Sequence, residues 1–163
     1  MFTCETQVYK LINMKGQKKA LRSHCPINFA VEVMGDKWSL LIVRDIALWG
    51  KLTFGEFAAS KEKIASNILA LRLEHLINEG VLLKTEDPAD RRKDFYTLTE
   101  KGLDLIPLLL ELVSWSERYD AGSEARKQGT FVARIRKDRE KLTSEIKKSV
   151  RGGGSVFGGP RCG

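Results

Sequence analysis

The spacing of apolar residues changes from a helical period to a strand-like one at Gly80. Before this point, the stretch "ASNILALRLEHLINEG" (residues 65–80) places its apolar side chains on one helical face. After it, "VLLKTE" and "RKDFYTL" are two short strand patterns separated by the turn "DPADR". A long helix followed at once by a β-hairpin leaves few architectures open to the chain.

The elements around this pair narrow the choice further. Two helical patterns precede it, and each is closed by a glycine, Gly35 or Gly50. Thr53 and Glu56 have the spacing of a capping box, which predicts a short helix. Thr99 can cap the helix after the hairpin, which includes "LIPLLLELVSWSERYD". This order predicts a mainly α fold with a small β-hairpin wing, a winged helix-turn-helix. In that fold residues 65–79 form the recognition helix, which lies in the major groove of DNA.

Charge and composition exclude several classes of function. The net charge of +7 divides into +4 for residues 1–23, −4 for 24–120 and +7 for 121–163, so the central region is mildly acidic. The chain has no Gly-rich phosphate loop, no HExxH and no nucleophile–His–acid set, so we expect neither an enzyme nor a cofactor. Its three cysteines are too far apart to suggest a metal site, and no apolar run is long enough for a membrane span.

These patterns predict four segments. Residues 1–22 are a basic N-terminal arm, and residues 23–120 are the DNA-binding and dimerisation domain. Residues 121–150 are a basic C-terminal helix, and residues 151–163 are a Gly-rich tail that we expect to be disordered. The N-terminus lacks the layout of a signal peptide, so a cytoplasmic location is expected.

The first turn of the predicted recognition helix is small and polar, which suits close approach to DNA. Ser66 and Asn67 offer hydrogen-bonding groups to base edges, and an Asn can pair with adenine through two hydrogen bonds. Plain helix capping is the alternative for both residues. Ala70 lies on the same outer face. Arg72 either contacts DNA, pairs with Glu74 or Glu79, or covers the core with the apolar stem of its side chain.

The hairpin turn carries a basic cluster of Arg91, Arg92 and Lys93. We expect these side chains to contact a phosphate backbone or to enter a minor groove. The alternative is a solvated turn in which they pair with neighbouring aspartates.

Two regions point to a second copy of the chain. The helix that contains "LIPLLLELVSWSERYD" is apolar on most sides, so we expect Leu105, Leu109, Leu112 and Trp115 to form a homodimer interface. The basic helix of residues 124–150 has a narrow apolar stripe, suited to a seam between helices. Its charged faces either contact DNA phosphates or are merely solvated, and charge alone does not separate the two.

Several motifs, in order, resemble the HxlR-type (MarR-related) winged helix-turn-helix transcriptional regulators. They are "CPINFAVEVMGDKWSLLIVRDI", "TFGEFAASKEKIASNILALRLEHLINEGVL" and "DPADRRKDFYTLTEKG", which together cover about residues 25–120. The resemblance implies a DNA-binding dimer whose terminal helices form the interface. Two features depart from the family pattern: the wing is Asp-rich rather than Pro-rich, and Leu71 stands where a polar residue is common.

The resemblance also draws attention to Cys25, which precedes Pro26 at a helix start. A helix N-terminus lowers the pKa of a thiol, and some relatives use a cysteine here to sense oxidants or electrophiles. The alternative is a small apolar residue that begins the helix.

The sequence therefore predicts a homodimeric regulator that binds pseudo-palindromic double-stranded DNA. A small-molecule or oxidant effector fits this expectation, and a membrane does not. The competing hypothesis is a winged-helix module that binds other proteins, which the acidic central region favours.

Overall fold

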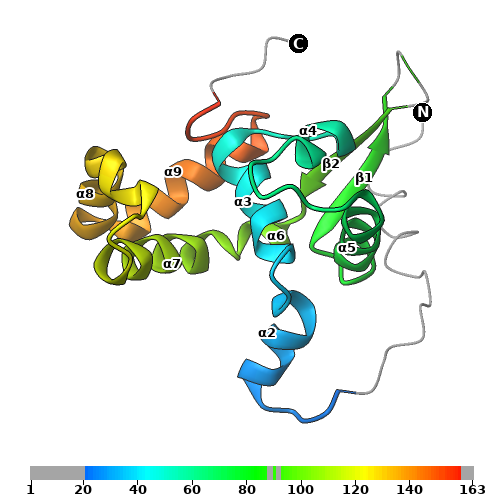
Figure 1. The fold of residues 1–163 in the computed structure, drawn as a ribbon, viewed down its shortest axis with the longest axis horizontal. Helices are drawn as coiled ribbons and strands as arrows, with labels where there is room; N and C mark the ends of the chain where they lie inside the picture. The colour runs from blue at the N-terminus through cyan, green and yellow to red at the C-terminus, as the bar shows by residue number, and fades with distance from the viewer. Residues whose placement is uncertain (1–20, 88–89, 91–92, 159–163) are drawn as a thin grey trace. The chain divides into compact units, whose positions relative to one another are not determined.

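The computed structural model describes residues 21–87, 90 and 93–158 (Figure 1). The chain divides between Val33 and Met34 into two compact units. In the first unit, the described part is mainly the helix α2 (Pro26–Met34). Proline suits the first turn of a helix because its fixed φ is helical and its missing N–H would have no partner there. Ile27, Phe29 and Val31 of this helix are exposed.

The second unit begins with the three helices of the predicted helix-turn-helix: α3 (Ser39–Trp49), α4 (Phe54–Ala58) and α5 (Ser66–Asn78). The capping box is present, because the Thr53 hydroxyl accepts from the Glu56 backbone N–H and the Glu56 carboxylate accepts from the Thr53 N–H. α3 ends at Gly50, whose φ of 69° is left-handed and favours glycine.

The predicted hairpin is confirmed. Strands β1 (Leu82–Glu86) and β2 (Asp94–Leu98) are antiparallel, and Leu82 pairs with Leu98 at one end of the ladder and Glu86 with Asp94 at the other. The segment before α4 adds to β2, since the Tyr96 N–H donates to the Leu52 carbonyl at 2.7 Å. The wing is thereby joined to the segment between α3 and α4.

After the hairpin, Thr99 caps a helix as predicted, but this is the short helix α6 (Glu100–Leu103). The prediction of one helix that continues through "LIPLLLELVSWSERYD" was wrong, because α7 (Ile106–Tyr119) is a separate helix. Pro107 stands in the first turn of α7, where it cannot donate an N–H, so the helical run is divided here. Gly102 lies so close to β1 that a Cβ atom there would be 2.3 Å from the Val81 carbonyl oxygen. This contact fixes α6 against the hairpin.

The prediction of one continuous helix over residues 124–150 was wrong. The structure has a 3-10 turn η1 (Glu124–Gln128) and two helices, α8 (Gly129–Lys137) and α9 (Arg139–Arg151). Asp138 separates them and caps α9, because its carboxylate accepts from the Lys141 N–H at 2.9 Å.

The apolar stripe of α8 and α9 lies in the core of the unit and not in an exposed seam. Its members are 5% exposed or less: Phe131, Ile135, Leu142 and Ile146. The helices pack against α7, and α9 also packs against α3 (Figure 1). The expectation of disorder after residue 150 is also wrong for residues 151–158, because Phe157 packs there on the rings of Trp49 and Phe131.

Candidate nucleic-acid interface

α5 presents its first turn to the outside. Its N-cap is Ala65, whose side chain cannot accept a hydrogen bond, so Ser66 and Asn67 lie inside the helix and do not cap it. Both side chains are exposed, and within the described part of the chain neither has a hydrogen-bond partner. The simple capping role is therefore excluded for this pair. Their polar groups are available to a partner in front of the helix.

The two sides of α5 differ sharply. Leu69, Leu73 and Leu76 are at most 2% exposed and fix the helix on the core. Ala70 and Leu71 are exposed on the opposite side, and the exposed fraction of Leu71 is 53%. The small Ala70 lets a partner approach the helix backbone closely. Leu71 offers an apolar contact such as a thymine methyl group accepts.

Arg72 has a partner in its own chain, although not a glutamate of its own helix. Its guanidinium lies 3.5 Å from the carboxylate of Asp36, which stands before α3. Asp36 also accepts from the Trp38 and Ser39 N–H groups. Burial alone would raise the pKa of Asp36, but these hydrogen bonds, the Ser39 hydroxyl and Arg72 together lower it. Arg72 thus connects α5 to the start of α3.

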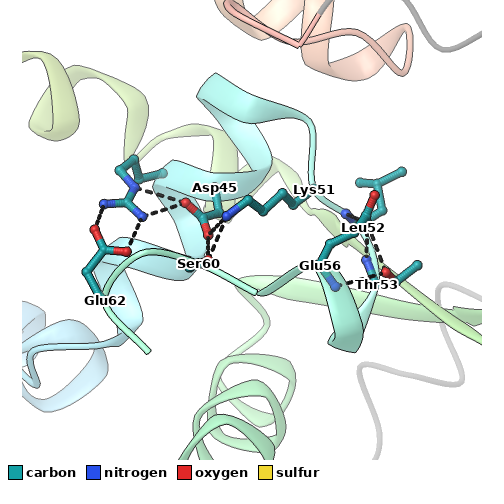
Figure 2. A network of polar contacts seen from close by, with 8 residues as sticks. Asp45, Lys51, Leu52, Thr53, Glu56, Ser60 and Glu62 are labelled. Carbon is teal, nitrogen blue, oxygen red and sulfur yellow. Dashed lines mark hydrogen bonds and ion pairs between the residues drawn. The ribbon is translucent and has the colours of Figure 1, made fainter. Parts of the chain in front are cut away.

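A buried charge cluster connects α3 to the turn between α4 and α5 (Figure 2). Asp45 is 3% exposed, and its carboxylate accepts from the Lys51 ammonium at 2.8 Å and from the Ser60 hydroxyl at 2.5 Å. Arg44 bridges Asp45 and Glu62, at 2.6 Å from each. The turn that leads into α5 is therefore attached to α3 at two points.

The pKa values of this cluster reflect its geometry. Burial would lower the pKa of Arg44, but hydrogen bonds to Glu62 and Asp45 outweigh it and raise that pKa. The same bond from Arg44 lowers the pKa of Glu62. Both groups therefore stay charged at neutral pH, and the cluster acts as a fixed clamp on the helix-turn-helix.

Lys63, which the sequence did not single out, lies in the turn just before α5. Among the residues whose backbone is described, it alone outside glycine has a positive φ, of 51°. Its side chain is exposed, and within the described residues it has no ion-pair partner. The positive φ is the only signal that marks this residue, and it is visible only in the structure.

The wing is described in part. Arg91 and Arg92 lie outside the described residues, whereas Lys93 is exposed and stands 4.0 Å from the Asp90 carboxylate. Lys84 on β1 pairs with Asp94 on β2 at 2.9 Å. The mixed charge expected of the Asp-rich wing is thus present near its tip.

The residues predicted for the dimer interface fall on different sides of α7. Leu109 is only 6% exposed and packs within its own chain, and Leu105 is half-buried, so the predicted interface was wrong in including Leu109. Leu112 and Trp115 are 41% and 61% exposed. Leu108 and Tyr119 extend the same exposed surface, and the Trp115 and Tyr119 rings are 5.3 Å apart. We call these four residues the α7 face.

Many basic side chains of the C-terminal region are paired within the unit. Arg134 pairs with Glu145 at 2.5 Å and Arg136 with Glu117 at 2.6 Å. Arg139 pairs with Glu111 of α7, and Arg151 with Glu100 of α6. α8 also lies at the other end of the unit from α5 (Figure 1). These contacts favour the solvated alternative over phosphate binding for this region.

Cys25 is an exposed free thiol in the first unit, directly before α2. Its carbonyl accepts the first helical hydrogen bond, from the Phe29 N–H at 3.0 Å. The residue therefore holds the helix-start position that the sequence predicted.

The family model of the HxlR-like helix-turn-helix matches residues 33–124, more than half of the chain. The chain belongs to this family. The match covers the helix-turn-helix, the wing and α7. It ends at the start of η1, so α8 and α9 lie beyond the family domain.

Two relatives that are named HTH-type transcriptional regulators support this assignment. The chain is 32% identical over 95 residues to the HTH-type transcriptional regulator YdeP of Bacillus subtilis, a match that covers 58% of this chain and 73% of YdeP. It is 32% identical over 100 residues to an HTH-type transcriptional regulator of Methanothermobacter thermautotrophicus, covering 61% and 76% of the two chains.

Two solved structures of transcription factors are also similar to this chain. The crystal structure of PA1607, a candidate transcription factor, matches with a TM-score of 0.57 and 40% identity over 63% of this chain and 70% of that one. The reduced form of the transcriptional regulator YodB from Bacillus subtilis matches with a TM-score of 0.50 and 26% identity, over 62% and 99%. The chain is therefore a DNA-binding transcriptional regulator of the HxlR-like family and not an enzyme. No helix among the described residues is long and apolar enough to cross a membrane.

Proposed function

We propose that the protein acts as a homodimer that places two α5 helices in successive major grooves of a pseudo-palindromic operator. The observation that supports this most directly is the first turn of α5, where Ser66 and Asn67 are exposed and unpaired within the described residues. A polar pair with no structural task, at the front of a helix held rigidly from behind, is suited to reading base edges.

Three further groups complete the proposed DNA contact. Ala70 allows close approach of the helix, and Lys63 holds a cation beside the α5 N-terminus, where phosphate groups also meet the positive end of the helix dipole. Arg91, Arg92 and Lys93 of the wing contact the neighbouring phosphates. Arg72 acts indirectly, because its contact with Asp36 holds α5 against α3.

The homodimer is proposed from the α7 face. Four large apolar side chains along one helix, between 38% and 65% exposed, form a patch that a second copy would cover. Since a two-fold interface uses the same surface on both partners, one helix can supply both halves. The dimer would work in the cytoplasm, where bacterial and archaeal DNA is found.

An oxidant is the proposed effector of the protein, and Cys25 is the residue with which it would react. Its thiol is exposed at the start of α2, and exposure is one requirement for a reactive cysteine. On this proposal, oxidant weakens operator binding by the wild type and leaves Cys25→Ser unaffected. Equal sensitivity of both proteins would overturn the role of Cys25.

DNase footprinting on the DNA upstream of the protein's own gene tests the main proposal. We expect two protected half-sites whose centres lie about one helical turn apart. A single protected half-site, or uniform weak protection along the fragment, would contradict the proposed two-fold arrangement.

A further inference from the structure

A cavity of about 470 Å³ lies in the second unit, between α3, α7 and the C-terminal segments η1 and α8. Its size is within the range of sites that bind small molecules. Its lining is mainly apolar and includes Leu41, Trp49, Leu112, Ser123, Phe131 and Phe157. Of the Asp45 cluster only Arg44 lines this cavity, whereas Asp45, Ser60 and Glu62 line a different and much smaller hollow.

Three aromatic rings form one wall of this cavity. The Phe157 ring lies 4.9 Å from Trp49 and 5.2 Å from Phe131, measured between ring centres. The backbone holds Phe157 in place, because its N–H donates to the Leu48 carbonyl at 2.7 Å. Gly158 approaches α3 so closely that a Cβ atom would stand 2.4 Å from the Trp49 carbonyl oxygen. These backbone contacts therefore fix the aromatic wall in the fold.

The polar groups of the cavity restrict the charge of its occupant. The hydroxyls of Ser116 and Ser123 are 3.0 Å apart, and Ser123 is 8% exposed, so the pair can exchange a hydrogen bond with one polar atom of a ligand. Two of the charged lining residues already have ion-pair partners. Arg44 binds Asp45 and Glu62, and Glu124 binds Lys61 at 2.9 Å, whereas Asp120 only accepts from the Gly122 N–H. An anionic ligand would therefore enter without a free cation to pair with, which is costly in an apolar site.

We infer that this cavity binds a small aromatic molecule that has no negative charge and carries one hydroxyl or amine group. Flat rings stack on the aromatic wall, and the polar group meets the serine pair. A second copy of the chain is the weaker occupant, because of the four residues of the α7 face only Leu112 lines the cavity. Gln128, Phe131 and Phe157 lie beyond residue 124, so the site depends on the chain's own C-terminal extension.

The position of the cavity couples it to α5 through α3. Leu41 and Trp49 line the cavity, while Asp45 on the same helix holds the turn that precedes α5. A ligand that moves α3 would therefore move the recognition helix. This consequence for operator affinity rests on the proposed function, whereas binding of the ligand does not.

The test uses N-phenyl-1-naphthylamine, a neutral aromatic amine whose fluorescence rises in apolar surroundings, and omits DNA. Trp49 is the only one of the three tryptophans that lines the cavity. In a Trp38→Phe/Trp115→Phe protein it is therefore the sole donor for energy transfer to the probe, when the exciting light is absorbed by tryptophan and not by tyrosine. We expect saturable binding with energy transfer from Trp49. No saturable binding, or binding without energy transfer, would overturn the inference.

A second test fills the cavity with a larger side chain and measures binding of the same probe. Ala125 lines the cavity, whereas Ala133 on α8 is exposed and lies outside the lining. Ala125→Trp therefore fills the cavity, and Ala133→Trp is the control that makes the same substitution elsewhere. We expect at least tenfold weaker probe binding for Ala125→Trp only, with circular dichroism confirming its fold. If Ala125→Trp does not fold, Gln128→Trp takes its place. Equal binding by the filled and control variants, or binding that falls as the protein concentration favours dimers, would overturn the site.

Discussion

The Ser60 hydroxyl donates a hydrogen bond of 2.5 Å to the buried carboxylate of Asp45, fifteen residues earlier in the chain. The contact joins α3 to the end of the short helix α4. With Lys51 and Arg44 it places a negative charge, 3% exposed, among two cations and a hydroxyl. A carboxylate in such surroundings stabilises the fold only while its partners stay in place.

Asp45→Asn should therefore destabilise the protein. The substitution removes the charge that neutralises Arg44 and Lys51, and we expect a loss of about 2–3 kcal/mol in the free energy of unfolding, measured with urea. Asp104→Asn is the control, because Asp104 pairs with Lys147 but is 70% exposed, and an exposed pair contributes about 0–1 kcal/mol. Equal losses for the two variants would show that burial of the cluster has no special effect.

The pairing of Asp36 predicts a dependence on pH. Its pKa in the folded chain lies below the ordinary value of 3.8. Its contribution to stability is therefore complete well above pH 3.8 and is lost as the pH falls through the lower folded-state value. The difference in unfolding free energy between wild type and Asp36→Asn should therefore shrink as the pH falls below 3.8 and level off below the folded-state pKa. A difference that stays constant from neutral pH to pH 3 would contradict the assignment.

The α7 face predicts the effect of a charge on self-association. Trp115→Glu places a carboxylate in the centre of the proposed interface, and we expect the dissociation constant of the dimer to rise by about tenfold or more. Sedimentation velocity over a range of protein concentrations measures it. Leu71→Glu is the matched control, since Leu71 is 53% exposed on α5. If wild type is a monomer, or if both variants behave alike, the α7 face is not the interface.

The buried stripe of α9 predicts a stability effect that a solvated helix would not show. Ile146 is 3% exposed, so Ile146→Ala should lower the free energy of unfolding by about 2–5 kcal/mol. Thr143→Ala, on the neighbouring half-buried position, should change it much less. Deleting residues 124–163 would expose the core, so point substitutions are needed to examine the charges of this region. An Ile146→Ala protein as stable as wild type would mean that α9 does not pack on the core in solution.

Some of this structure could be predicted from the sequence because the signals are local. The apolar period of α5, the capping box at Thr53 and the turn residues between the strands each act within a few positions. The break at Asp138 has a local signal as well, although the prediction of one continuous helix passed over it: an Asp followed by a new helical period is an N-cap signal.

Other features depend on contacts between distant positions. Arg72 and Asp36 are 36 residues apart, and Ser60 meets Asp45 only because α4 folds back on α3. A helix apolar on most sides gives no indication of which side its own chain covers, so Leu109 and Leu112 could not be told apart. Lys63 is marked by a positive φ, and many sequences permit that conformation without requiring it.

The central claim is that the front of α5 reads bases while the groups around it hold phosphates. It is tested most directly by measuring affinity for the operator and for a scrambled duplex over a range of salt concentrations, in wild type, Asn67→Ala and Lys63→Gln. Asn78→Ala, at the far end of α5, is the control.

We predict that Asn67→Ala lowers operator affinity by about 1–3 kcal/mol, leaves scrambled DNA unaffected and keeps the salt slope. Lys63→Gln should instead weaken both duplexes alike and reduce the salt slope by about one per subunit. If Asn67→Ala weakens both duplexes equally, or behaves as Asn78→Ala does, then Asn67 does not read bases and the account of α5 given above is wrong.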